Sequence, residues 1–208
     1  MSFTDFSSLS QLIPFVISII IYLKYGLDNK LKLFMMVMAV WATSEFISLK
    51  IVIENSHIYN IHWITSTMMI LYFFCEISGI STKNVFFLIL GYFLFVVLRI
   101  CFMGNFFIWD MPIVYVSCYL IIGLCALTLI KMVNDEVSEL FHKPIFWISS
   151  ALLLYFTSTL IVWGLFDRSE NLENVHFMEN VYNIHSVINI CTNLFYSYAF
   201  LCRIKENS

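Results

Sequence analysis

The sequence predicts an all-α integral membrane protein with seven transmembrane helices, and three observations support this prediction. The chain of 208 residues is 61% hydrophobic and only 12% charged, whereas about a quarter of the residues in a soluble domain are charged. Its apolar residues gather into long segments that short polar breaks separate. Lysine and arginine are distributed unevenly between alternate breaks. We therefore expect residues 1–208 to form a single membrane-embedded helical bundle.

Each apolar segment is close to the length that a membrane helix needs. A helix crosses the roughly 30 Å hydrocarbon core with about 20 residues, because each residue rises ~1.5 Å. The predicted spans cover residues 8–25, 33–53, 60–79, 84–103, 112–132, 144–166 and 178–202. Pro112 and Pro144 fall in the first turn of the fifth and sixth spans. A missing N–H leaves no helical bond unmade there, so these prolines agree with the predicted boundaries.

The basic residues predict the orientation of the chain in the membrane. With the N-terminus outside, the inner side carries eight of them: Lys24, Lys30, Lys32, Lys83, Lys131, Lys143, Arg203 and Lys205. The outer side carries only Lys50 and Arg168, and Arg99 lies inside a span. Cytoplasmic loops of membrane proteins are enriched in lysine and arginine. The sequence thus predicts a multi-pass protein with its N-terminus outside and its C-terminus in the cytoplasm.

Several kinds of chemistry have no motif in this sequence. It contains no H-E-x-x-H, no G-x-S-x-G and no P-loop, which are the motifs of zinc proteases, hydrolases and nucleotide-binding proteins. It has no basic tail that would bind nucleic acid. His62 and His185 lie in the outer half of the predicted bundle, but no cysteine or carboxylate completes a metal or haem ligand set beside them. We therefore predict no cofactor and no metal, and we favour a non-catalytic protein without excluding an enzyme.

Five polar residues inside the predicted spans are candidates for a functional pocket in the outer half of the membrane. They are Glu45, His62, Arg99, His185 and Asn189. Charged residues inside a membrane are costly, and they commonly mark functional sites. Glu45 lies ~12 Å and Arg99 ~6 Å below the outer ends of their spans by helical rise. A guanidinium side chain bridges such a difference, so the two residues are candidates for a buried ion pair.

The last span carries a polar stripe within the stretch VYNIHSVINICTNLFYSYAF, residues 181–200. Its members recur every three or four residues, which places them on one helix face: Tyr182, His185, Asn189, Asn193 and Tyr196. Such stripes often form hydrogen bonds between membrane helices. The sixth span offers partners for these bonds at Ser149, Ser150, Thr157 and Ser158. The alternative is that the stripe lines a pore.

The last two spans carry a resemblance to a known group of proteins. The matching stretches are KPIFWISSALLLYFTSTLIVWGLF, residues 143–166, and VYNIHSVINICTNLFYSYAFLC, residues 181–202. They resemble the C-terminal part of small seven-helix inner-membrane proteins of Bacteroidota that are associated with histidine kinases or with defence loci. The resemblance implies a location in a bacterial inner membrane and a sensor or signalling subunit. It implies no catalytic residue.

These observations favour one function and leave two alternatives open. The favoured one is a non-catalytic membrane sensor or regulatory subunit. It would couple the outer polar pocket to a protein partner at the cytoplasmic face, either a histidine kinase or a defence protein. The first alternative is an oligomeric pore or accessory protein of an antiviral defence system, including RNA-targeting CRISPR loci. The second is a lipid-modifying enzyme in which His185 and Glu45 act together as the catalytic base. Membrane lipid is a partner in every case.

Overall fold

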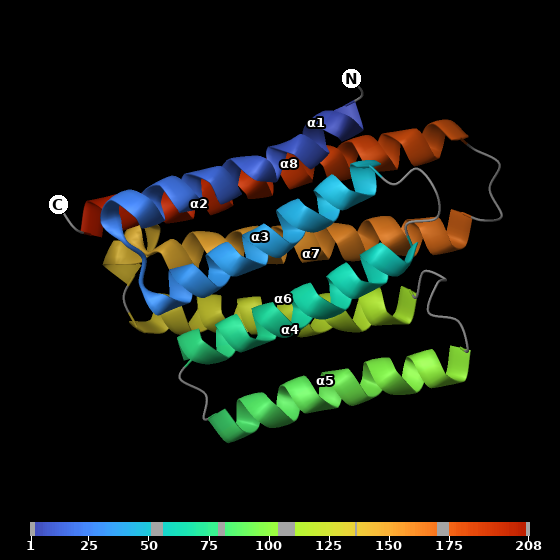
Figure 1. Cartoon of the computed structure of the whole chain (residues 1–208), viewed down its shortest axis with the longest axis horizontal. Helices are drawn as coiled ribbons and strands as arrows, with labels where there is room; N and C mark the ends of the chain where they lie inside the picture. The colour runs from blue at the N-terminus through green and yellow to red at the C-terminus, as the bar shows by residue number, and fades with distance from the viewer. Residues whose placement is uncertain are drawn as a thin grey trace. The chain divides into compact units, whose positions relative to one another are not determined.

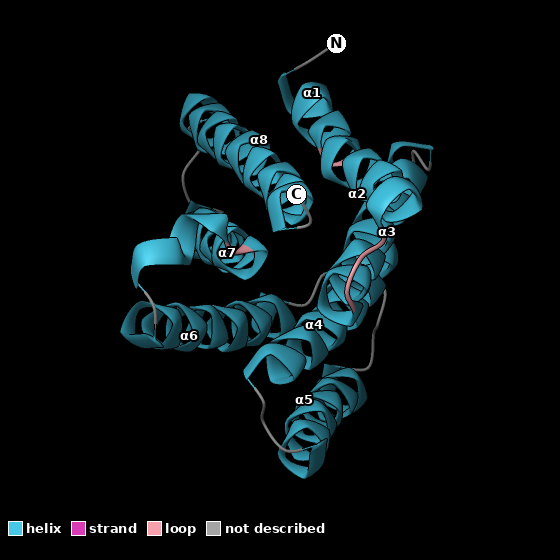
Figure 2. Cartoon of the chain, turned by 90° about the vertical axis from the view of Figure 1, so that its left-hand side faces the viewer, coloured by secondary structure: helices cyan, strands magenta, loops and turns pink. Residues whose placement is uncertain are grey.

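A computed structural model of the chain describes residues 3–50, 56–78, 82–103, 111–135, 137–169 and 175–206. Helices make up nearly all of this part of the chain (Figure 1). No strand occurs within it, as Figure 2 shows, so the predicted all-α class is confirmed. The helices in chain order are α1 (Phe3–Ser10), α2 (Leu12–Tyr25), α3 (Asn29–Lys50), α4 (Ser56–Ser78), α5 (Thr82–Met103), α6 (Met111–Asp135), the 3₁₀-helix η1 (Val137–His142), α7 (Pro144–Ser169) and α8 (Val175–Glu206).

The helices follow the predicted spans closely. The first span corresponds to α1 and α2 together, and each later span lies largely within one helix from α3 to α8. Three segments are long and apolar enough to cross a membrane: Phe6–Tyr25, Met111–Asn134 and Pro144–Leu165. Large apolar side chains are exposed on several helices, among them Leu23 and Phe102, which are 77% and 83% exposed. Such surfaces suit lipid better than water, and these helices indicate a membrane protein.

Packing divides the chain into two compact units. The first comprises Met1–Gly26 and Cys125–Ser208, and we call it the terminal unit. The second comprises Leu27–Leu124, and we call it the middle unit. The helix α6 contributes its first half to the middle unit and the rest to the terminal unit.

Pro14 divides the first predicted span into two helices. A proline ring inside a helix clashes with the carbonyl group four residues earlier and offers it no N–H. For Pro14 that carbonyl belongs to Ser10, the last residue of α1. At the break, the N–H of Gln11 donates to the carbonyl of Ser8, three residues earlier, at 3.3 Å. The helix α2 begins at the next residue. The first predicted span, residues 8–25, therefore covers the end of α1 and all of α2, within the apolar segment Phe6–Tyr25.

The turn between α2 and α3 has a chemical reason at each of its ends. Gly26 follows α2 with φ 72°, a conformation that glycine adopts at little cost, and its N–H donates to the carbonyl of Tyr22 at 3.1 Å. Asp28 precedes α3, and its Oδ1 accepts a hydrogen bond from the N–H of Leu31 at 2.8 Å. A carboxylate in this position caps a helix N-terminus. The bonds explain why the helices end and begin here.

The starts of α6 and α7 confirm the interpretation of their prolines. Pro144 is the first residue of α7, and Pro112 is the second residue of α6. Between these helices the sequence predicts a polar break. The structure places the 3₁₀-helix η1 there, and the N–H of Lys143 donates to the carbonyl of Leu140 at 3.1 Å at its end.

In the terminal unit, α8 packs against α7, α2 and α1 (Figure 1). The helices α7 and α8 pack against each other, and both carry small or aliphatic side chains that are fully buried, including Ala151 and Leu152 on α7 and Ala199 on α8. Small residues allow membrane helices to approach closely, so that dispersion contacts hold them together. Both of the long C-terminal helices are therefore fixed against each other along much of their length.

In the middle unit, α4 packs against both α3 and α5. A buried cluster of Leu71, Tyr92, Val96 and Ile113 joins α4, α5 and the first half of α6. The hydroxyl of Ser117 donates to the carbonyl of Ile113 at 2.7 Å, so the hydroxyl of Tyr92 donates to Ser117 at 2.8 Å. On the other side of α4, the rings of Phe34 and Phe73 lie 5.2 Å apart. These contacts hold α4 in place on two sides.

Candidate functional site

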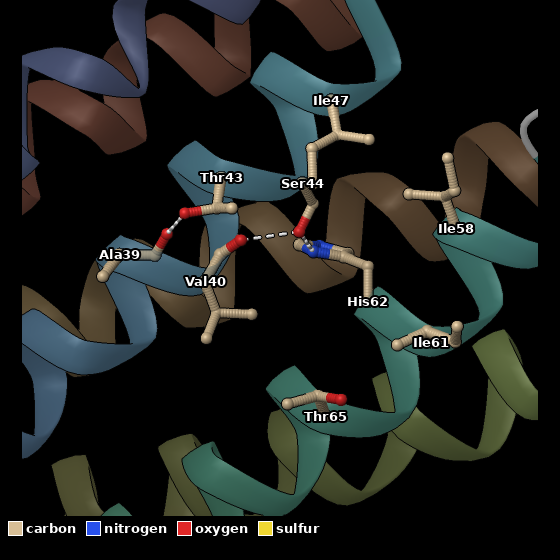
Figure 3. Close-up of a pocket in the computed structure, with 9 residues that line it drawn as sticks. All are labelled: Ala39, Val40, Thr43, Ser44, Ile47, Ile58, Ile61, His62 and Thr65. Atoms are coloured by element: carbon tan, nitrogen blue, oxygen red, sulfur yellow. Dashed lines mark hydrogen bonds between the residues drawn. The ribbon is translucent and has the colours of Figure 1, made fainter. Parts of the chain in front are cut away.

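An open groove lies between α3 and α4 in the middle unit (Figure 3), and its volume is about 460 Å³. Three of its lining residues, Thr43, Ile47 and Ile61, are exposed, so the groove opens onto the surface of the helix pair. The other lining residues are Ala39, Val40, Ser44, Ile58, His62 and Thr65. We call this feature the α3–α4 groove. It brings His62, a predicted site residue, into a concave and mostly aliphatic surface.

His62 is bonded to Ser44 across this groove. The Nδ1 atom of His62 lies 2.7 Å from the hydroxyl oxygen of Ser44 (Figure 3). The same hydroxyl oxygen lies 2.6 Å from the carbonyl oxygen of Val40, one turn earlier in α3. A serine hydroxyl in a helix commonly donates to that carbonyl. The side chains of Ser44 and His62 thus tie α3 to α4 at one point in the wall of the groove.

Two indole rings lie beside the imidazole of His62. The ring centroids of Trp41 and Trp63 are each 6.4 Å from that of His62, and the Trp63 ring stands nearly perpendicular to it at 85°. Both tryptophans are buried. Together with Ser44 they limit the orientations open to the imidazole. The site is therefore ordered on its protein side and open on its groove side.

The two charged candidates of the middle unit, Glu45 and Arg99, lie on the two helices that pack against α4. Glu45 follows Ser44 on α3 and is half-buried, and Arg99 is half-buried on α5. The helix α4 packs against both α3 and α5. The ion pair that the sequence suggests for Glu45 and Arg99 stays a prediction.

The polar residues of α8 find partners on α1. The side-chain amide of Asn189 donates to the hydroxyl of Ser7 at 3.0 Å, and that of Asn193 donates to the hydroxyl of Ser10 at 2.7 Å. The hydroxyl of Ser7 also donates to the carbonyl of Ser186 at 3.3 Å. All four side chains are buried. We call Ser7, Ser10, Asn189 and Asn193 the serine–asparagine cluster, and it joins the first helix to the last.

For Asn189 and Asn193, the partners expected on the sixth span are replaced by serines of α1. Thr157 and Ser158, on α7, donate to carbonyl groups of their own helix, those of Leu153 and Tyr155. A serine or threonine within a helix has such a carbonyl within reach, so its proton is used locally. The amides of Asn189 and Asn193 therefore bond to α1, not to α7.

The rest of the predicted stripe is divided between different environments. Tyr182 is 42% exposed, whereas Tyr196 is buried. His185 is half-buried, and its ring centroid lies 5.7 Å from that of Tyr155 on α7. The stripe is thus continuous in sequence spacing, and its middle part, Asn189 and Asn193, bonds to α1.

The five residues of the predicted outer pocket lie in both units. Glu45, His62 and Arg99 belong to the middle unit, and His185 and Asn189 to the terminal unit. A pocket formed by all five stays a prediction. Within the part of the chain that the structure describes, no three His, Cys, Asp or Glu side chains lie together in a group that would hold a metal ion.

Sequence reasoning missed the three serines that complete these sites. Ser7 precedes the predicted first span, Ser10 lies near its start, and Ser44 is one of three hydroxyl residues in α3. The spacing of Ser7 and Ser10 was a signal for these two serines. Residues three or four apart lie on the same helix face, so Ser7 and Ser10 share one face of their helix, as Asn189 and Asn193 share one face of theirs. No comparable signal marked Ser44.

Comparison with protein-family models, with curated proteins and with solved structures found no match to this chain.

Proposed function

We propose that this chain is a seven-helix protein of a bacterial inner membrane, with its N-terminus outside, that acts as a non-catalytic sensor or regulatory subunit. The α3–α4 groove is its sensing site. A protein at the cytoplasmic face, such as a histidine kinase or a defence protein, receives the signal. The resemblance of the last two spans to kinase-associated and defence-associated membrane proteins agrees with this function.

The observation that carries the proposal is the bond between Ser44 and His62. It ties two helices at a point that a ligand in the groove can reach. A ligand shifts a conformational equilibrium only by binding one state better than another. A ligand that engages His62 meets this condition, because it competes with or reinforces the contact that sets the spacing of α3 and α4.

The proposed orientation connects this site to the cytoplasm. With the N-terminus outside, α3 runs from the inner to the outer surface and α4 returns. Ser44 and His62 then lie toward the outer ends of these helices. The inner ends of the two helices lie near the basic residues Lys30 and Lys83 in the sequence. A change in the spacing of α3 and α4 is thereby transmitted to the side on which a soluble partner binds.

The serine–asparagine cluster supports this function over the pore alternative. A pore would need the amides of Asn189 and Asn193 to face a lumen, whereas both side chains are buried and bonded to α1.

Site-specific crosslinking in membranes of the native host tests the proposal. A photoreactive amino acid is placed at Lys83 and Lys131, which are exposed and lie at predicted inner ends. The matched control position is Phe102, which is exposed at the predicted outer end of α5. We expect one soluble or membrane protein to crosslink at the inner positions and not at Phe102. The yield should change at least twofold in the Ser44→Ala variant, which lacks the tie between α3 and α4.

Three results would contradict the proposal in different ways. Crosslinks between copies of this chain alone would favour the oligomeric pore. Equal capture of the same protein at Phe102 would refute the orientation. Unchanged capture in the Ser44→Ala variant would separate partner binding from the groove and remove the sensing role of His62.

A further inference from the structure

The single proton of the Ser44 hydroxyl determines which hydrogen-bonding group the groove presents. This hydroxyl has two close neighbours, the carbonyl oxygen of Val40 at 2.6 Å and Nδ1 of His62 at 2.7 Å. A hydroxyl donates one hydrogen bond and accepts others. Both contacts are hydrogen bonds only when the hydroxyl donates to Val40 and Nδ1 of His62 carries a hydrogen and donates to Ser44. The geometry therefore assigns the Nδ1–H tautomer to the neutral imidazole.

This tautomer leaves an unshared electron pair on Nε2 of His62. In neutral histidine one ring nitrogen donates and the other accepts. Within the described part of the chain, His62 makes no hydrogen bond other than the one to Ser44. Its Nε2 is also not one of the fully buried side-chain atoms that lack a hydrogen-bond partner. The groove thus presents a hydrogen-bond acceptor, and its natural complement is a ligand that carries a proton donor.

The rest of the groove suits a hydrocarbon chain. Its walls are formed mainly by Ala39, Val40, Ile47, Ile58 and Ile61. Its volume of about 460 Å³ lies within the roughly 300–1,000 Å³ at which pockets hold small organic ligands. Among the described residues that line it, His62 is the only ionisable one. The groove is open where Thr43, Ile47 and Ile61 are exposed, so in the proposed membrane setting a molecule dissolved in lipid reaches it directly.

We infer that the α3–α4 groove binds a long-chain carboxylic acid, with its carboxyl group on Nε2 of His62 and its chain along the aliphatic wall. This inference names the ligand class of the proposed sensing site and in that respect rests on the proposed function. The carboxyl group suits both states of the ring. A neutral acid donates its proton to Nε2, and a carboxylate accepts the hydrogen of a protonated Nε2. The proton lies on one atom or the other, and the hydrogen bond persists.

Other membrane lipids match the groove less well. A quinone offers only carbonyl acceptors, which would face the electron pair on Nε2. A phospholipid presents a phosphate, which proteins bind with arginine or lysine, and the groove residues that the structure describes include neither. An esterified acid has the same chain as the free acid but no proton to donate. The ester is therefore the sharpest control ligand.

Photolabelling of the purified full chain in lipid nanodiscs tests the inference. The probe is a palmitic acid analogue with a diazirine on its chain, and the labelled peptides are identified by mass spectrometry. We expect the label on residues 39–47 and 58–65. Unlabelled palmitic acid should compete at a concentration roughly threefold to tenfold lower than methyl palmitate, which corresponds to one hydrogen bond.

Two variants and one matched control decide the role of His62. His62→Phe keeps an aromatic ring but removes Nε2, so the advantage of the acid over its ester should disappear. Ile61→Trp keeps His62 and fills the mouth of the groove, so labelling of both segments should fall at least threefold. Ile61 is 52% exposed, which makes this larger side chain tolerable even if His62→Phe does not fold. His185→Phe makes the same change at a half-buried histidine of the terminal unit and should behave like the unaltered chain.

Each contrary result overturns a defined part of the inference. A label spread evenly over all helices would refute the site. Equal competition by acid and ester, or an unchanged preference in His62→Phe, would refute the role of Nε2. Binding needs no partner, so acid binding with no effect of Ser44→Ala on partner capture would leave the ligand assignment standing and end the sensing role. Partner capture that depends on Ser44 without acid binding would do the reverse.

Discussion

Two polar sites in this molecule use similar side chains in opposite ways. In the serine–asparagine cluster, α1 and α8 exchange hydrogen bonds, and all four side chains are buried. At the α3–α4 groove, Ser44 and His62 also join two helices, but the histidine retains a ring nitrogen without a bond in the described part of the chain. The first site is closed and the second is open.

The difference shows how to separate packing from recognition among polar residues in a membrane helix. An amide that is buried against a hydroxyl of a neighbouring helix has its bonding capacity used within the protein, and it contributes to stability. A group that is fixed on one side and free on the other keeps capacity for a ligand. By this criterion Asn189 and Asn193 hold the structure together, and His62 is the residue available for binding.

The largest effect is expected from removing both amides of the closed site. Asn189→Leu with Asn193→Leu should lower the free energy of unfolding by roughly 1–3 kcal/mol, because two bonds between helices are lost and the larger apolar groups crowd buried serine hydroxyls. Unfolding in mixed micelles by rising sodium dodecyl sulfate measures the change. Proteolysis of the N-terminal segment should also become faster, since these bonds hold α1 to α8.

Asn183→Leu is the matched control for this prediction. Asn183 lies on α8 and is exposed, so the same chemical change should alter the free energy of unfolding by no more than about 0.5 kcal/mol. Ion flux through liposomes completes the comparison with the pore alternative. A change in flux with full stability in the double variant would mean that the asparagines face a lumen, and the packing interpretation would then be wrong.

A smaller effect is expected at the aromatic contacts between α7 and α8. The Trp147 ring centroid lies 5.3 Å from that of Phe195 and 4.8 Å from that of Tyr198, and its Nε1 donates to the carbonyl of Phe141 at 2.9 Å. Trp147→Leu should lower the free energy of unfolding by about 1–2 kcal/mol, because ring packing and the hydrogen bond are both lost. The same micelle titration measures it.

Trp147→Phe separates the two contributions. It keeps an aromatic ring against α8 and removes only the hydrogen bond, so we expect a loss below about 1 kcal/mol. If this variant were as unstable as Trp147→Leu, the bond to Phe141 and not the ring packing would hold this end of the two helices.

The sequence predicts the helices well because length and apolarity determine them locally. Every predicted span lies largely within one helix or, for the first, a broken pair of helices, and Pro112 and Pro144 mark the two starts correctly. The number of membrane crossings and their direction stay predictions from the distribution of basic residues. Pro14 is also evident in the sequence. It interrupts a helix at Ser10 only if that helix begins before the proline, and the sequence did not predict a helix as early as α1.

The partners of the polar residues were not predictable in the same way. The spacing of Asn189 and Asn193 indicates a common face, but not which helix covers it, and adjacent spans suggested α7 when the partner is α1. Helix order in space depends on the sum of many weak contacts between surfaces of similar composition. His62 was predicted as a site residue because it is a polar residue within a predicted span. Ser44 carries no such signal in the sequence, and its role is evident only once α3 and α4 lie side by side.

The smallest structural effect, and the sharpest test of the open site, is expected from Ser44→Ala. Ser44 is half-buried, so its loss should change the free energy of unfolding by only about 0.5 kcal/mol. It should nevertheless move the hydrogen of neutral His62 from Nδ1 toward Nε2, because Nδ1 loses its acceptor. Nitrogen-15 NMR of histidine-labelled protein distinguishes the two tautomers. Thr43→Ala is the control, since Thr43 donates only to Ala39 of its own helix and should leave the His62 signal unchanged. A spectrum that already shows an Nε2–H tautomer in the unaltered chain would mean that the groove presents a donor, and its ligand would then have to be an acceptor.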